Sequence, residues 1–132
     1  MITILLSLAG AAQTLDPEIR YTPGKGAYSI CGVTAASPVA LVETVMALPG
    51  AELLEQKGQY LTLVQDSERR FWTLAMNDHP AAPAIICRTI VDRPGGGSEL
   101  KMEISCFADK ASCDQLAQDF VAHNRAVLQG AQ

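Results

Sequence analysis

The chain has 132 residues and a mass of 14.1 kDa, with 10 basic and 14 acidic residues, a formal net charge of −4 and a pI of about 5.0. Hydrophobic residues make up 48% and charged residues 18% of the sequence, which excludes an intrinsically disordered chain and favours one globular domain. The basic residues are scattered and do not form a stripe that neutralises successive phosphates, so we expect no nucleic-acid partner.

Residues 1–12 form an uncharged apolar segment that passes into small residues, with Ala9 and Ala11 at the A-x-A spacing of a secretory cleavage site. We therefore predict a signal peptide over 1–12 and a periplasmic or secreted protein of the bacterial type. The segment has no basic residue, and Ile2 and Ile4 alternate with their neighbours, so an N-terminal core strand is the alternative. A spanning helix needs about 20 apolar residues, so we expect no membrane span in the mature chain.

The next part of the chain begins with a lead-in over 13–26 that is expected to be irregular, because prolines and glycines recur in it. One short strand is expected over 27–33. Ser37 followed by Pro38 predicts a helix start, with Ser37 as the N-cap and Pro38 in the first turn. The apolar spacing continues this helix over 38–48, where a Pro-Gly pair ends it.

The middle of the chain alternates short apolar runs with turn residues, which is the pattern of an antiparallel meander. The last run shows the period of two most clearly, with Met102 and Ile104 on one face and Lys101 and Glu103 on the other. The predicted strands cover 51–56, 59–65, 70–76, 84–92 and 99–107.

A second helix is expected from 111 or 112 to 128, because Ser112 and Gln115 have the spacing of a capping box. Its apolar stripe consists of Cys113, Leu116, Phe120 and Val127, and it also carries His123. The simplest assembly is a single α+β domain over 13–132. In it, an antiparallel sheet of four to five strands has both helices packed on one face, in the order helix, meander, helix.

The four cysteines are Cys31, Cys87, Cys106 and Cys113, an even number without a C-x-x-C pair. This usage predicts two disulfide bonds in an oxidising compartment. Cys106 and Cys113 flank a short loop between a strand and a helix, so we prefer the pairing of Cys31 with Cys87 and of Cys106 with Cys113. The pairings of Cys87 with Cys106 or with Cys113 remain open.

The two histidines are the candidates for acid–base chemistry or metal binding, since imidazole titrates near neutrality. His79 follows Asp78 in a predicted loop, and His123 lies near Asp119 on the second helix. The paired histidines of a metal-binding helix are missing, and no motif positions a nucleophile. We therefore expect no catalytic residue, metal or cofactor, with His79 as a turn residue and His123 at the flank of a buried face.

The hairpin over 59–76 is apolar on both sides. Its turn sets a register in which Leu61 and Leu63 pair with Leu74 and Trp72 on a core face. On the other face, Tyr60, Thr62 and Val64 pair with Ala75, Thr73 and Phe71.

This second face supplies the candidate binding patch, because an open antiparallel face is normally polar. The patch consists of Tyr60, Thr62, Val64, Phe71 and Thr73, and Ile86 and Ile90 of the next strand extend it. Either the N-terminal segment with Tyr21 and Tyr28 covers the patch, or the patch is exposed and binds a partner.

The leading hypothesis is an exported non-catalytic domain that binds another protein, as an accessory, inhibitor or immunity-type protein. The first alternative is a small hydrolase or metal-dependent enzyme centred on the His79 loop. The second alternative is a structural protein of the cell envelope.

Overall fold

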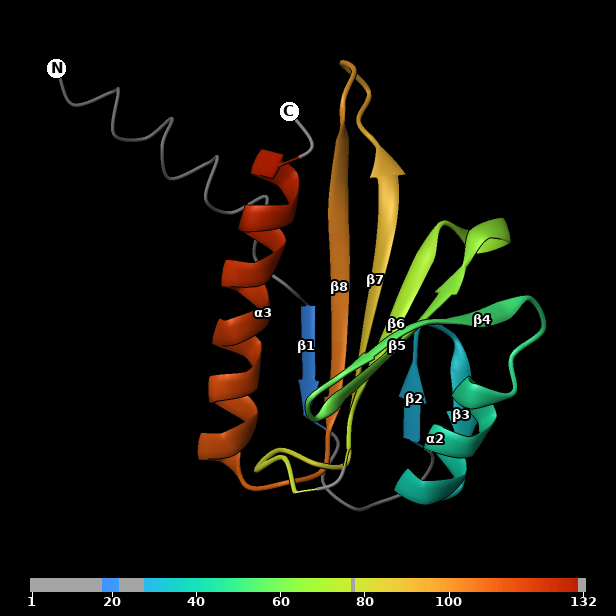
Figure 1. Cartoon of the computed structure of the whole chain (residues 1–132), viewed down its shortest axis with the longest axis vertical. Helices are drawn as coiled ribbons and strands as arrows, with labels where there is room; N and C mark the ends of the chain where they lie inside the picture. The colour runs from blue at the N-terminus through green and yellow to red at the C-terminus, as the bar shows by residue number, and fades with distance from the viewer. Residues whose placement is uncertain (1–17, 22–27, 77, 131–132) are drawn as a thin grey trace, which may run out of the picture.

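A computed structural model describes residues 18–21, 28–76 and 78–130, and within these ranges the chain forms one main sheet, a small hairpin and two helices (Figure 1). The predicted signal peptide over 1–12 lies outside the described residues, as does the lead-in over 13–26 apart from 18–21. No helix within the described ranges is long and apolar enough to cross a membrane.

The main sheet, as far as the structure describes the chain, has six strands in the order β1-β8-β7-β6-β5-β4. Neighbouring strands from β4 to β8 are antiparallel, which confirms the predicted meander. The bounds of these strands are Ala51–Lys57 (β4), Tyr60–Gln65 (β5), Arg70–Ala75 (β6), Ala84–Asp92 (β7) and Ser98–Cys106 (β8).

The edge strand β1, at Glu18–Tyr21, pairs in parallel with β8. The sequence predicts an irregular lead-in here, and that prediction is wrong for these four residues. So short a segment has little strand signal of its own. It becomes a strand because the outer edge of β8 offers backbone groups that need hydrogen-bond partners.

The short strands β2 (Tyr28–Ile30) and β3 (Val33–Ala35) form an antiparallel hairpin, where the sequence predicts one strand over 27–33. The two turn residues, Cys31 and Gly32, have φ values of 47° and 83°. Positive φ at both central positions is typical of a two-residue hairpin turn, for which glycine is favoured and cysteine is not. The turn was missed because only Gly32 has the expected residue type.

The first helix, α2, spans Pro38–Met46 and begins where the sequence predicts. The side chain of Ser37 accepts a hydrogen bond from the Ala40 amide at 3.1 Å, so this serine is the N-cap. The helix ends at Met46, two residues before the predicted end at Leu48.

The second helix, α3, spans Lys110–Gly130 and is longer than predicted at both ends. Its N-terminal cap is Asp109, whose carboxylate accepts hydrogen bonds from the Ser112 amide at 3.0 Å and the Ser112 hydroxyl at 2.9 Å. The predicted capping box at Ser112 and Gln115 is therefore wrong, because Ser112 already lies inside the first turn and Gln115 bonds to Asp119 instead.

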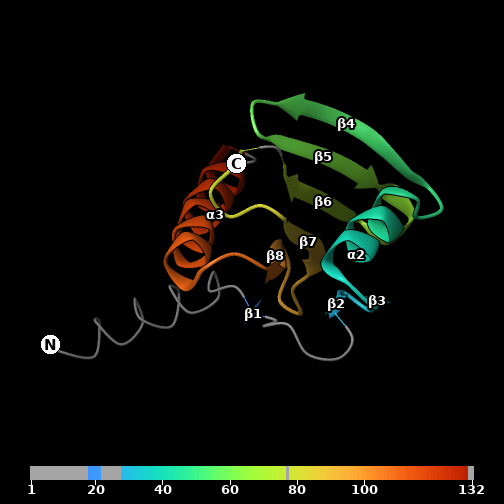
Figure 2. The same ribbon diagram turned by 90° about the horizontal axis from the view of Figure 1, so that it is seen from below.

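The two helices lie on opposite faces of the sheet (Figure 2), which corrects the prediction that both pack on one face. Ile85 and Ile86 are adjacent in β7 and both are fully buried, so both faces of this strand need a cover. The α2 face, which packs on α2 and the β2–β3 hairpin, buries Leu63, Trp72, Leu74, Ile85 and Cys87. The α3 face buries Ala75, Ala84, Ile86, Met102, Ile104 and Cys106.

The register of β5 on β6 places the two apolar sides of this hairpin as predicted. Leu63 pairs with Trp72 on the α2 face, and Thr62 pairs with Thr73 on the α3 face. The α3 face therefore carries the side chains that the sequence assigns to the candidate binding patch.

The two predicted disulfide bonds are present, and they join Cys31 to Cys87 and Cys106 to Cys113. The first fastens the turn of the β2–β3 hairpin to β7, and the second fastens the end of β8 to the first turns of α3. Each bridge thus holds one of the covering layers to the sheet.

We expect the two bridges to differ in their contribution to stability, because they close loops of different length. The sequence separations are 56 residues for Cys31–Cys87 and 7 for Cys106–Cys113, which correspond to about 4 and about 2 kcal/mol of chain entropy. Urea unfolding should therefore give a free-energy loss about 2 kcal/mol larger for Cys31→Ala/Cys87→Ala than for Cys106→Ala/Cys113→Ala. Equal losses, or the reverse order, would contradict this account.

Candidate functional site

A cavity of about 1070 Å³ lies on the α3 face of the sheet. α3 packs along β8, and the turn between β4 and β5 comes round toward α3, so the cavity has a wall on each side (Figures 1 and 2). The floor residues are Tyr60, Thr62, Phe71, Thr73, Arg88 and Ile90. The walls include Leu54 and Glu55 of β4, Glu99 and Leu100 of β8, and Asp119, Phe120 and His123 of α3.

Four of the five residues of the candidate binding patch line this cavity, and Val64 is the exception. α3 forms the opposite wall, and Tyr28 lies on the other face of the sheet, where it packs against Phe107 at 5.3 Å between ring centroids. The expectation that Tyr28 covers the patch is therefore wrong. Of the two N-terminal tyrosines, the side chain of Tyr21 lies outside the described residues.

Arg88 is the charged side chain of the cavity floor, and it is only 8% exposed. Its guanidinium carbon lies 5.8 Å from the ring centroid of Phe71 and 5.4 Å from that of Phe120, so two aromatic faces stabilise the cation. Burial lowers the pKa of Arg88, but a guanidinium stays protonated in proteins. Among the described residues, no carboxylate forms an ion pair with it.

The hydrogen bonds of Arg88 leave most of its donors unused. One terminal nitrogen donates to the Thr73 hydroxyl at 3.1 Å, and the buried Nε has no partner. The Thr73 and Thr62 oxygens are 3.0 Å apart. An oxygen that accepts from a cation is a better donor through its own hydrogen, so we assign Thr73 as the donor to Thr62.

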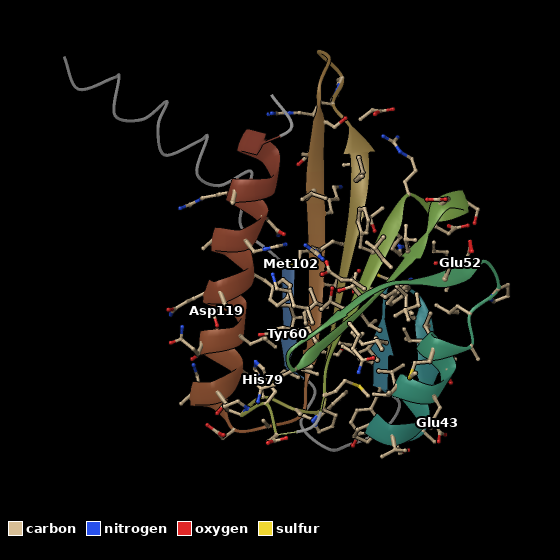
Figure 3. The ribbon with its side chains drawn as sticks, viewed as in Figure 1. Glu43, Glu52, Tyr60, His79, Met102 and Asp119 are labelled. Carbon is tan, nitrogen blue, oxygen red and sulfur yellow. A yellow bond between two sulfur atoms is a disulfide. The ribbon has the colours of Figure 1, made fainter. Side chains whose placement is uncertain are left out.

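The His79 ring is held through both of its nitrogens. The Ala81 amide donates to Nδ1 at 3.0 Å, so the ring proton is on Nε2, which lies 2.8 Å from the Tyr60 hydroxyl and donates to it. Figure 3 shows Tyr60 and His79 together between the sheet and α3. His79 therefore positions Tyr60, while Asp78, the carboxylate that precedes it in the sequence, is exposed on the loop.

Asp119 and His123 are two groups of α3 that interact electrostatically with other residues of the cavity. Burial and the negative charge of Asp119 raise the pKa of Tyr60, so this phenol stays protonated at neutral pH. Partial burial and the positive charge of Arg88 lower the pKa of His123, and the carboxylate of Glu55 opposes them. His123 is thus mainly neutral at pH 7.

No group of three or more potential metal ligands occurs among the residues that the structure describes. No protein-family model matches the sequence, and comparisons with curated proteins and with solved structures give no significant match. The candidate site therefore rests on the geometry of the cavity.

The sequence pattern identifies the patch but not Arg88. This residue interrupts the apolar run of β7, where Ala84 to Cys87 are fully buried. A charged residue at an inward position of an apolar strand was the available signal, because such a position is normally filled by an apolar side chain.

We expect the pKa of His123 to report on the charge of Arg88. In an NMR titration of the wild type, the His123 pKa should lie below the ordinary value of about 6.5, and it should rise in Arg88→Met because the nearby positive charge is gone. Arg70→Met is the matched control, since Arg70 stacks on Trp72 on the α2 face. An unchanged or lower His123 pKa in Arg88→Met would contradict the arrangement.

Proposed function

We propose that this protein is a non-catalytic binding domain and that its ligand occupies the cavity between α3 and the sheet. The observation that carries the proposal is a cavity of about 1070 Å³ whose exposed surface is mainly apolar, although polar and charged side chains such as Thr73, Arg88 and Glu55 also line it. Small-molecule sites have volumes of about 300 to 1,000 Å³ and a lining of this kind. A mainly apolar small molecule therefore fits this site.

Binding is favoured over catalysis by the state of the candidate acid–base residue. Both nitrogens of His79 are engaged within the protein, one by the Ala81 amide and one by the Tyr60 hydroxyl. A general base needs a free lone pair within reach of the proton that it removes. The enzyme alternative centred on His79 would require this hydrogen-bond arrangement to break.

The two disulfide bonds support function in an oxidising compartment. Such bonds persist in secreted and periplasmic proteins and are rare where thiols are kept reduced. We therefore propose the periplasm or the cell exterior as the place of action.

An uncharged naphthyl dye, N-phenyl-1-naphthylamine, tests whether the cavity takes up an apolar guest. Its fluorescence should rise on binding to the wild type at one dye per chain. Ile90→Trp fills the cavity floor and should weaken binding by about tenfold or more, since a well-packed apolar site loses affinity when its volume is taken. Leu100→Trp, at the residue paired with Ile90 on β8, is a second blocking variant.

Val39→Trp is the matched control, because Val39 is 64% exposed on α2, on the opposite side of the sheet. Each variant is first checked for a cooperative unfolding transition. The proposal is wrong if the wild type binds no dye, or if the blocking and control variants bind it equally well.

A second candidate function, binding of another protein, is favoured by the edge strand β4. Its Leu53 and Leu54 are 60% and 53% exposed. An edge strand presents unpaired backbone groups, to which an extended segment of a partner can add as a further strand.

We expect a protein partner to depend on these two leucines and not on the cavity. In a pull-down from periplasmic extract, Leu53→Lys/Leu54→Lys should lose a partner that the wild type and Ile90→Trp both retain. Val39→Lys/Met46→Lys, which changes two other exposed apolar residues, is the control and should retain it. Identical recovery by all four proteins would exclude β4 as the docking edge.

A further inference from the structure

Arg88 gives the cavity a chemical preference that its apolar lining alone does not. We propose that the ligand is an amphipathic monocarboxylate, whose carboxylate binds the Arg88 guanidinium and whose apolar body fills the remaining cavity. This inference rests on the proposed function and names the ligand class of the same site.

Arg88 is a buried cation without a counter-ion among the described residues. It is 8% exposed, and none of the described carboxylates forms an ion pair with it. A cation removed from water is costly unless it is paired and hydrogen-bonded. The cavity that Arg88 lines is the space from which an anion can reach it.

Arg88 also has hydrogen-bond donors that the protein does not use. A guanidinium has five N–H groups, and the Thr73 hydroxyl accepts from one terminal nitrogen. Nε has no partner, but it is buried, so the donors open to a ligand are the remaining N–H groups of the terminal nitrogens. Parallel N–H groups of arginine match the two oxygens of a carboxylate, which is why arginine binds this group through two hydrogen bonds.

The other charged residues of the cavity limit the charge of the ligand. Three carboxylates, those of Glu55, Glu99 and Asp119, also line the cavity, and Lys57 is the one other cation in the described lining. This excess of negative charge around the floor opposes a second anionic group, whereas one carboxylate at the floor meets Arg88. A single negative charge at one end of an apolar molecule satisfies both conditions, and a polyanion such as a nucleotide does not.

The lining beside Arg88 suits an apolar body. The guanidinium lies over the rings of Phe71 and Phe120, and Ile90 and Leu100 continue the apolar lining from neighbouring strands. Burial of each CH₂ group raises the affinity about fourfold. An alkyl chain therefore binds this lining whatever its head group, and the carboxylate adds the contribution of Arg88.

Decanoate and decanol separate these two contributions, because they share the chain and differ at the head group. Isothermal titration calorimetry is done with both compounds below the concentration at which they aggregate. The proteins are the wild type, Arg88→Met, Arg88→Lys and the control Arg70→Met, which removes an arginine from the α2 face. Arg88→Met removes an unpaired buried charge and keeps an unbranched apolar side chain on the cavity floor, so we expect it to fold.

The expected result is that the wild type binds decanoate about tenfold to a hundredfold more tightly than decanol. Arg88→Met should abolish this difference by weakening decanoate alone, while Arg88→Lys retains part of it and Arg70→Met all of it. Equal affinity of the wild type for both compounds, or an equal loss of both in Arg88→Met, overturns the carboxylate inference and leaves the apolar cavity in place. Binding of neither compound overturns the ligand class, and the dye experiment then decides separately whether the cavity binds apolar molecules.

Discussion

A single helix is too narrow for the sheet face on which α3 packs, and the cavity follows from that mismatch. A helix with its side chains is about 10 Å across, whereas neighbouring strands lie about 4.8 Å apart, so one helix covers about two strands. α3 lies along β8, and the part of the face that belongs to β5 and β6 needs another boundary. The twist of the sheet supplies it by bringing the β4–β5 turn round toward α3 (Figure 2). On the α2 face, a helix and a hairpin share the cover, and Trp72 and Leu74 of β6 are fully buried there.

Arg88 is the point at which the floor of this cavity departs from what stability alone requires. A leucine or methionine in its place would extend the apolar floor without the cost of removing a charge from water. The surroundings lower that cost in two ways, since Phe71 and Phe120 offer their ring faces and Thr73 accepts a hydrogen bond. These contacts leave Nε unpaired. They reduce the cost of burying the guanidinium, but none of them supplies a negative charge. Residues that break the pattern of an otherwise consistent fold are most often found where function sets the requirement.

Local patterns were enough to predict much of the fold, and the failures lie where distant segments meet. The period of two and the turn residues predicted the meander and the register of β5 on β6, and Ser37 with Pro38 predicted the start of α2. The apolar stripe of α3 shows that this helix needs a sheet but does not say which face it covers, so its placement was predicted wrongly. The candidate patch was found because alternation assigns side chains to one face. Arg88 was missed because its setting depends on Phe71 and Phe120, which no local pattern brings together.

The Cys106–Cys113 bridge has a mechanical consequence for the cavity. It fastens α3 to the sheet near the beginning of the helix, and His123 lies about ten residues, or about 15 Å, further along. Asn124, one residue further, is 3% exposed and donates a hydrogen bond to the Met102 sulfur at 3.3 Å, so α3 is also held to β8 beyond His123. The wall formed by Asp119, Phe120 and His123 therefore lies between two anchors on the same strand, and its distance from the floor is set by the fold and not by the ligand.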